Sequence, residues 1–215
     1  VGNWLGQEDC KWNNVNNWCI ATIPVSQDTI RILKGCVNMP ILDSAIVITS
    51  HLQIDSNSTL YIKKSATLQV NNSIHSYGYI LADSGNIILS ASQNQSIYTI
   101  YDYTIQNLTL NNNGRTSLLG SGILNITGIL QFANNTNYDT LYTNGKLVIA
   151  STEKSTATVA DITNGNTSWG NTITGEVTVQ RFLQGKRAWR LLTAPVTAYN
   201  TSQDGSLFTN WQNGG

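Results

Sequence analysis

The stretch HLQIDSNSTLYIKKSATLQV, residues 51–70, repeats one short pattern at a constant interval. Each repeat is a pair of apolar residues on either side of one other residue, and each pair begins eight positions after the previous one: Leu52/Ile54, Leu60/Ile62 and Leu68/Val70. Residues two apart lie on one face of a β-strand, so each pair predicts a short strand with one buried face. The segments between the pairs contain polar residues typical of turns. The stretch therefore predicts short strands that follow one another around stacked layers.

A longer interval in the sequence supports this interpretation. Similar apolar positions recur 21 to 25 residues apart, at Ile62, Ile87, Leu108 and Leu130. Three short strands per turn, at a stride near eight, would give about this turn length. We therefore predict an all-β fold in which residues 41–175 form a right-handed parallel β-helix, or solenoid. Short strands at regular spacing also fit a β-sandwich, and two packed antiparallel sheets would contradict the prediction.

The first 40 residues differ in composition from the rest of the chain. They contain Trp4, Trp12 and Trp18 and all three cysteines. A stack of β-layers exposes an open end, which pairs with other chains unless something covers it. We therefore predict that residues 1–40 form a Trp-rich cap over one end of the solenoid. The alternative is an aromatic platform that stacks on sugars.

The overall composition disfavours two classes of partner. Only 11% of the residues are charged, against about 25% in average proteins, and polarity comes instead from residues such as the 26 asparagines. The formal net charge is zero, whereas a nucleic-acid-binding surface needs an excess of basic residues. No apolar run approaches the roughly 20 residues that span a bilayer. We therefore predict neither a nucleic-acid partner nor a membrane span.

Catalytic or metal-binding chemistry has little support in the sequence. A carbohydrate-cleaving enzyme needs clustered carboxylates or an acid held by a metal. The twelve acidic residues are scattered, mostly in turn-like segments where an Asp side chain binds the main chain. His51 and His75 would lie on adjacent turns, but two histidines without a third ligand make a weak metal site. We therefore predict no catalytic residue, metal or cofactor.

The run YTIYDYTI, residues 98–105, brings three tyrosines around Asp102. Tyr98, Tyr101 and Tyr103 could form an exposed aromatic ribbon that contacts a glycan. Cross-strand aromatic packing at a turn is the alternative, and the sequence favours it.

Three segments of the chain carry recognisable motifs. The first has tryptophan, glycine, asparagine, proline and isoleucine at characteristic positions: Trp4, Gly6, Trp12, Asn13, Asn17, Trp18, Pro24, Ile30, Ile32 and Pro40. The second is TIQNLTLNNN followed by GILNITGILQF, and the third is GEVTVQRF followed by RAWRLLTAPV. Together these motifs resemble modules of large surface proteins of Bacteroidota.

The resemblance implies a place and a role for the chain. Members of this group are usually long, multidomain, exported proteins, and many resemble adhesins exported by type IX secretion. It implies a non-catalytic structural or adhesive module of a secreted protein on the bacterial cell surface. Its partners would be other domains of the same long chain, surface polysaccharide or other cell-surface proteins. A carbohydrate-binding module is the alternative function, and a β-helix enzyme that cleaves polysaccharide is the next.

Export also implies covalent modifications. An exported chain meets an oxidising environment, so we expect a disulfide. Cys19–Cys36 is the first choice because it would tie the cap to the entering strand, and pairings of Cys10 with either partner remain open. Three Asp-Ser/Thr-aliphatic triplets resemble the O-glycosylation acceptor motif of Bacteroidota, and their acceptors are Thr29, Ser44 and Thr140.

The sequence rhythm changes after Gly175. The segment EVTVQRFL, residues 176–183, is longer than the earlier strands, and residues 187–196 add an apolar cluster that needs a core. We therefore expect residues 176–215 to begin a β-sandwich domain that is completed by chain beyond Gly215. The alternative is a cover over the C-terminal end of the solenoid.

Overall fold

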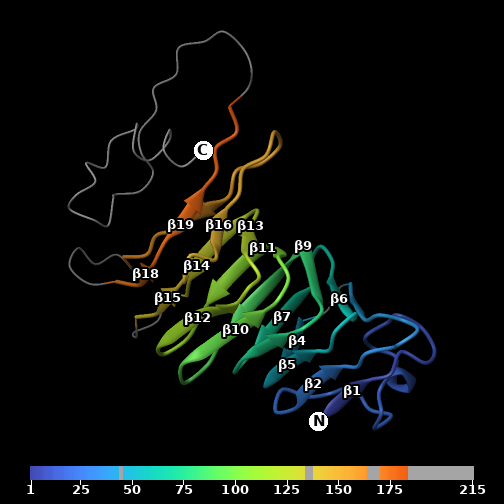
Figure 1. Ribbon diagram of the computed structural model, residues 1–215. Helices are drawn as coiled ribbons and strands as arrows, with labels where there is room; N and C mark the ends of the chain where they lie inside the picture. The colour runs from blue at the N-terminus through green and yellow to red at the C-terminus, as the bar shows by residue number, and fades with distance from the viewer. Residues whose placement is uncertain (44–45, 134–137, 164–169, 184–215) are drawn as a thin grey trace, which may run out of the picture. The chain divides into compact units, whose positions relative to one another are not determined.

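The structure is an all-β solenoid, seen in a computed structural model that describes residues 1–43, 46–133, 138–163 and 170–183. Short strands follow one another around the described part of the chain and stack in layers (Figure 1). The helix found among these residues, η1 (Val15–Asn17), is a single 3₁₀ turn. The predicted all-β solenoid is therefore confirmed.

One face of the solenoid, sheet A, takes a strand from each successive turn. Its described strands, in spatial order, are β1 (Gly2–Trp4), β2 (Thr29–Ile32), β5 (His51–Ile54), β8 (Ile74–Ser76), β10 (Gln95–Thr99), β12 (Arg115–Gly120), β15 (Thr140–Tyr142) and β18 (Thr172–Thr174). Every neighbouring pair in this list is parallel. Parallel pairing of strands one turn apart is the pattern of a solenoid and contradicts the antiparallel sandwich alternative for this region.

Sheet B supplies the other two faces. The second face contains β3 (Ile41–Leu42), β6 (Thr59–Ile62), β13 (Leu124–Ile126), β16 (Leu147–Ile149) and β19 (Val177–Val179). The third face contains β4 (Ile46–Thr49), β7 (Thr67–Val70), β14 (Ile129–Phe132) and β17 (Thr158–Val159). The long strands β9 (Tyr79–Leu89) and β11 (Tyr103–Leu110) contribute to both faces, and their mutual register shifts between Ile105 and Asn107, where the chain turns from one face to the next.

The strand register corrects one part of the predicted repeat. Ile87, Leu108 and Leu130 do stack in one column on the third face, as expected. The residue before Ile87 in this column is Leu68, whereas Ile62 lies one strand earlier, on β6 of the second face. The apolar pairs repeat within every turn, so spacing alone does not identify which face a given pair occupies.

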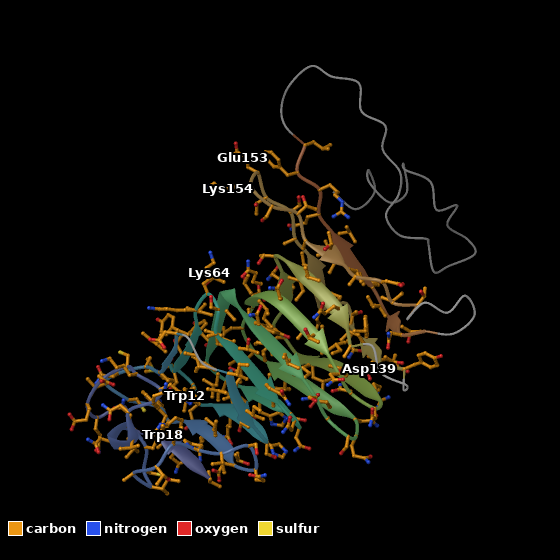
Figure 2. The ribbon with its side chains drawn as sticks, turned by 180° about the vertical axis from the view of Figure 1, so that it is seen from behind. Trp12, Trp18, Lys64, Asp139, Glu153 and Lys154 are labelled. Atoms are coloured by element: carbon orange, nitrogen blue, oxygen red, sulfur yellow. The ribbon has the colours of Figure 1, made fainter. Side chains whose placement is uncertain are left out.

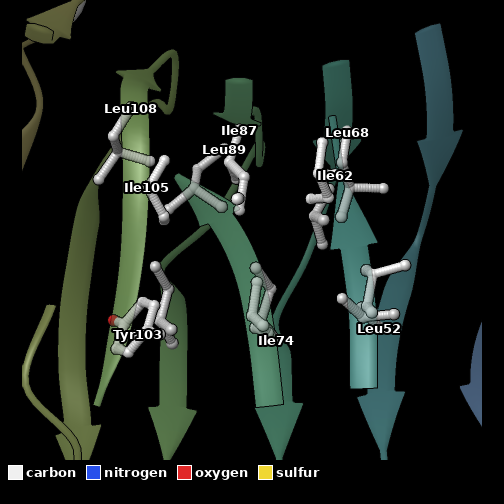
Figure 3. Packing of buried hydrophobic residues seen from close by; sticks show 14 of the residues in the cluster. Leu52, Ile62, Leu68, Ile74, Ile87, Leu89, Tyr103, Ile105 and Leu108 are labelled. Carbon is white, nitrogen blue, oxygen red and sulfur yellow. The ribbon is translucent and has the colours of Figure 1, made fainter. Parts of the chain in front are cut away.

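Alternation along each strand separates core from surface. In β5, Leu52 and Ile54 are buried while His51 and Gln53 face outward. The inward side chains of successive turns pack against one another, as Figure 3 shows for Leu52, Ile74 and their neighbours. Burying one such side chain contributes roughly 1.5–3 kcal/mol. The core therefore holds the layers together and leaves the outward residues available for other roles.

The three N-terminal tryptophans form the predicted cap. They belong to the segment around β1, the end strand of sheet A in the described residues. Trp4, Trp12 and Trp18 are at most 3% exposed, and their ring centroids lie 4.8 to 6.1 Å apart; Figure 2 labels Trp12 and Trp18. Trp4 Nε1 donates to the Asn38 carbonyl at 2.7 Å. Because the rings are buried, the alternative of a sugar-stacking platform in this segment is wrong.

A ladder of buried polar side chains follows the corner that leads into sheet A. Asn112 Oδ1 accepts from Ala91 N at 2.9 Å, and Asp139 Oδ2 accepts from Asn112 N at 3.0 Å. One turn further on, Asn171 Oδ1 accepts from Asp139 N at 2.9 Å. The Asp139 carboxyl, labelled in Figure 2, is buried, and burial raises its pKa, although the main-chain hydrogen bonds from Asn112 and Gly114 act in the opposite direction. Asp139 is thus an acid at a ladder position where the adjacent turns have the amides Asn112 and Asn171.

The strand pairing shifts the expected segment limits at both ends. β1 and β2 lie within sheet A, so strands of the predicted cap also belong to the solenoid. β19 (Val177–Val179) pairs in parallel with β16, so the solenoid continues past the expected limit at residue 175. The chain divides into the compact units Val1–Phe182 and Leu183–Gly215. The expected β-sandwich falls almost entirely on residues 184–215, outside the described residues, and stays a prediction.

Candidate functional site

The outward face of sheet A carries the most distinctive surface side chains. Ile74 and Ser76 in β8 point inward, so His75 between them points outward and Tyr77 follows on the same side. The parallel register aligns Gln53 of β5 with His75, and His75 with Tyr98 of β10. Side chains from separate turns therefore form continuous outward columns.

We call five outward aromatic side chains the aromatic strip. They form two contact groups: His75, Tyr77 and Tyr98 on the side of sheet A, and Tyr79, at the start of β9, with Tyr101. The ring of Tyr98 lies 5.8 Å from that of His75 and 5.7 Å from that of Tyr77, between centroids. Tyr79 and Tyr101 stack at 4.5 Å with an interplanar angle of 17°. Tyr77 remains 43% exposed, and Tyr79 and Tyr101 are exposed to a similar degree. Within each of the two groups the rings support one another at the surface.

The strip differs from the tyrosine ribbon expected from the sequence. Tyr103 is 4% exposed and lies in the core, where burial raises its pKa (Figure 3). Tyr101 and Tyr103 would share a face in a continuous strand, but the turn between β10 and β11 separates them. Cross-strand packing does occur at Tyr98. Tyr77 and Tyr79 were not predicted as surface residues; alternation from His75 is a signal for Tyr77, whereas Tyr79 lies beyond the corner that separates β8 from β9.

A first shallow hollow lies beside the strip on sheet A. It has a volume of about 350 Å³ and is lined by Thr29, His51, Leu52, Gln53, Ser73 and His75. His51 and His75 thus lie on adjacent turns, as expected. Within the described residues no group of three His, Cys, Asp or Glu side chains is arranged to hold a metal. The hollow instead presents imidazole, amide and hydroxyl groups, which exchange hydrogen bonds with polar ligands.

A second hollow of about 400 Å³ adjoins the first and shares Gln53 with it. It is lined by Arg31, Lys34, Gln53, Asp55, Ser56, Tyr77 and Ile100. Arg31 binds Asp55 through two parallel hydrogen bonds, Nε to Oδ1 and Nη2 to Oδ2, each 3.0 Å long. Bidentate pairing fixes the plane of a guanidinium group. Arg31 and Asp55 therefore hold each other in place in this hollow.

Other carboxylates hold the main chain. Four of them accept main-chain N–H groups at 2.8 to 2.9 Å: Asp9, Asp28, Asp102 and Asp161. Asp9 and Asp161 bind the residue two positions later, as in the expected Asx-turns, whereas Asp102 binds Ile123 on the next turn. The hydrogen bonds from Lys11 N and Asn17 lower the pKa of Asp9. These carboxylates therefore act as hydrogen-bond acceptors in turns and between turns.

The cysteines do not form the expected disulfide. Cys10, Cys19 and Cys36 are all free thiols in the structure. Cys36 Sγ donates to the carbonyls of Trp4 at 3.2 Å and Leu33 at 3.1 Å, and burial raises the pKa of this thiol. Cys19 Sγ accepts from Asn3 N at 3.4 Å. The two sulfurs contact different main-chain groups, and the structure contains neither the Cys19–Cys36 bond nor a pairing of Cys10.

The three candidate O-glycosylation acceptors have different surroundings. Thr29 is half-buried in β2 and lines the first hollow. Thr140 is half-buried in β15, where its Oγ1 accepts from Thr172 Oγ1 at 3.0 Å, and the preceding Asp139 is buried. Ser44 lies outside the described residues. Glycosylation at these sites stays a prediction.

Comparison with known proteins gives a partial match. None of the helices in the described part of the chain is long and apolar enough to cross a membrane. No curated protein and no solved structure matches the chain. Residues 3–88 match the model of a family described as "Domain of unknown function (DUF8693)". This match includes the cap and three members of the aromatic strip, so over these residues the chain is similar to that family.

Proposed function

We propose that the chain is a non-catalytic structural or adhesive module of a large secreted cell-surface protein. The observation that carries this proposal is the engagement of the carboxylates described above. Asp55, the carboxylate in the hollows, is tied to Arg31 by two hydrogen bonds, and four others accept main-chain N–H groups. The oxygens of these carboxylates are thus engaged by partners within the chain, and this engagement supports a structural use of the acids.

The architecture supports a structural role. Parallel strands stack turn on turn around a continuous core, and the tryptophan cluster covers the N-terminal end. In such a stack each turn contacts mainly its neighbours, which gives an elongated and laterally extended surface. This arrangement suits a module that separates other domains or presents a binding face.

We infer from the resemblance to Bacteroidota surface proteins that the module lies on the outside of a bacterial cell, after export by type IX secretion. Its partners would be other domains of the same chain, surface polysaccharide or other cell-surface proteins. Antibodies against the chain should label intact cells that express the full protein. Labelling that appears only after permeabilisation would contradict this location.

The non-catalytic role is tested by incubating the purified chain with uncharged and acidic polysaccharides and measuring new reducing ends. We expect no release above that of buffer, with a known polysaccharide hydrolase as positive control. Saturable release that is lost in Asp55→Asn would overturn the proposal and favour the polysaccharide-cleaving alternative.

A further inference from the structure

We propose that the aromatic strip and the two hollows beside it form a binding face for an uncharged polysaccharide chain. The face takes side chains from β2, β5, β8 and β10, which are neighbours in sheet A, from the turns next to these strands and, through Tyr79, from the start of β9. The inference rests on the non-catalytic function proposed above, and it names the class of partner that an adhesive module would hold.

The exposed rings match one property of a sugar. A sugar ring has an apolar face of C–H groups that packs on an aromatic ring, while its hydroxyl groups point to the edge. Tyr77 remains 43% exposed although it contacts Tyr98, and Tyr79 and Tyr101 stack on each other. Rings already held by their neighbours lose little conformational freedom when a ligand binds. The strip is therefore preorganised for flat, partly apolar rings.

The hollows match the other property, the hydroxyl groups. Gln53 lines both hollows, between the imidazoles of the first and the Arg31–Asp55 pair of the second. Gln53 Nε2 also lies 3.4 Å from Asp55 Oδ1, so these groups form one connected polar surface. Ligand sites that combine a few fixed polar groups with aromatic surface are typical of small-molecule and sugar recognition. Together the strip and the hollows offer both kinds of contact.

The direction of the face follows from the strand register. Arg31, Gln53, His75 and Tyr98 occupy one outward column across four strands. Neighbouring strands lie about 4.8 Å apart, which is close to the length of one residue in an extended polysaccharide. A chain lying along the stacking direction would therefore meet about one side chain of the column per sugar. This repeat favours a polymer over a single small molecule.

The charges around the face favour an uncharged ligand. Arg31 and Lys34 are the cations and Asp55 is the carboxylate that line the second hollow, so its formal charge is +1 and no row of cations is present in its lining. Arg31 is already paired with Asp55. A polymer of uronic acids or a nucleic acid would require an excess of cations along its path. The face is thus complementary to a neutral polymer.

Affinity electrophoresis of the purified full chain tests the proposal. Native gels contain either an uncharged polysaccharide (xyloglucan, galactomannan, hydroxyethyl cellulose, a β-1,3-glucan or an α-glucan) or an acidic one (polygalacturonate or alginate). We expect at least one uncharged polysaccharide to retard the chain and the acidic ones to leave its mobility unchanged. Tyr77→Ala and Tyr98→Ala should each weaken retardation about tenfold, and Tyr77→Phe, which keeps the ring, should retain most of it.

The matched control is Tyr138→Ala. Tyr138 is 44% exposed, close to the 43% of Tyr77, and lies outside the strip. This control should bind like the unchanged chain, and circular dichroism establishes that each variant is folded.

Several results would overturn the proposal. Retardation only by acidic polysaccharides would show that the ligand is not an uncharged polysaccharide. Retardation that the strip variants leave unchanged would show that the polysaccharide binds elsewhere on the chain. No retardation by any polymer, or a dimer that Tyr77→Ala dissociates in analytical ultracentrifugation, would mean that the strip has another role. None of these results contradicts the non-catalytic function, which fails only if new reducing ends appear.

Discussion

The turns from β5 to β12 and the turns that end in β15 and β18 build the same sheet with different regularity. In-register inward positions from Leu52 to Leu118 are 21 to 23 residues apart, whereas Leu141 and Ile173 are 32 apart. The early positions are fully buried, whereas Ile173 is only partly buried. A parallel stack therefore accepts longer turns, provided that the next strand returns to register.

The added residues precede two strands of sheet A in sequence, and a residue of the polar ladder follows each of these longer segments. They lie between β14 and β15 and between β17 and β18. Asp139 and Asn171 directly precede β15 and β18, and each accepts a main-chain N–H from the turn before. These bonds anchor the chain at the position where it enters sheet A. We infer that the ladder restores register after each longer segment.

The largest expected effect concerns the capped end. Trp4→Ala removes a fully buried ring and leaves the Asn38 carbonyl without its indole donor. The change should lower the free energy of unfolding by about 3–5 kcal/mol, measured by urea denaturation. Trp4→Phe, which keeps an aromatic ring, should cost less. A loss below about 1 kcal/mol for Trp4→Ala would mean that the cap does not stabilise the stack.

A matched pair of isoleucines on sheet A tests the difference between the two regions. Ile74→Ala, in the regular turns, should cost about 2–5 kcal/mol because it leaves a cavity in a close-packed core. Ile173→Ala, in the last described strand of the sheet, should cost less because that side chain is only partly buried. Urea denaturation of both variants gives the comparison. Equal losses would show that the longer turns are packed as well as the regular ones.

The smallest expected effect is a gain of stability in the ladder. The pKa of Asp139 is raised in the folded state by burial, so this group favours folding in acid, and that contribution is lost as pH rises through the folded-state pKa. Asp139→Asn removes the ionisable group and with it the loss of stability at higher pH. It also gives this position the same amide side chain as Asn112 and Asn171. The variant should therefore be more stable than the unchanged chain at neutral pH by about 1 kcal/mol, with a gain that shrinks in acid.

Urea denaturation across the acidic to neutral range measures this pH dependence. Glu153→Gln, at an exposed acid, is the control and should change stability by about 0.5 kcal/mol or less. A neutral-pH loss for Asp139→Asn would show that the carboxylate stabilises the ladder.

Much of the fold could be predicted from local sequence because a solenoid repeats one local rule. The alternating pairs at Leu52/Ile54 and Leu60/Ile62 state which side chains are buried, and the tryptophans of the cap are large apolar groups that require a core. The same regularity limits the prediction. Every turn contains several similar pairs, so Ile62 and Leu68 are distinguished only by the register of the stack.

The sequence by itself determined that short strands coil into stacked layers, because the period of two and the stride of eight are local properties. Only the tertiary structure decided the surface. Tyr77 and Tyr98 are 21 positions apart in sequence and meet because adjacent turns align, whereas a turn sends Tyr103 into the core. The position of Asp139 between Asn112 and Asn171 also depends on how adjacent turns align. Contacts between turns depend on the exact length of each turn, which short-range patterns do not specify.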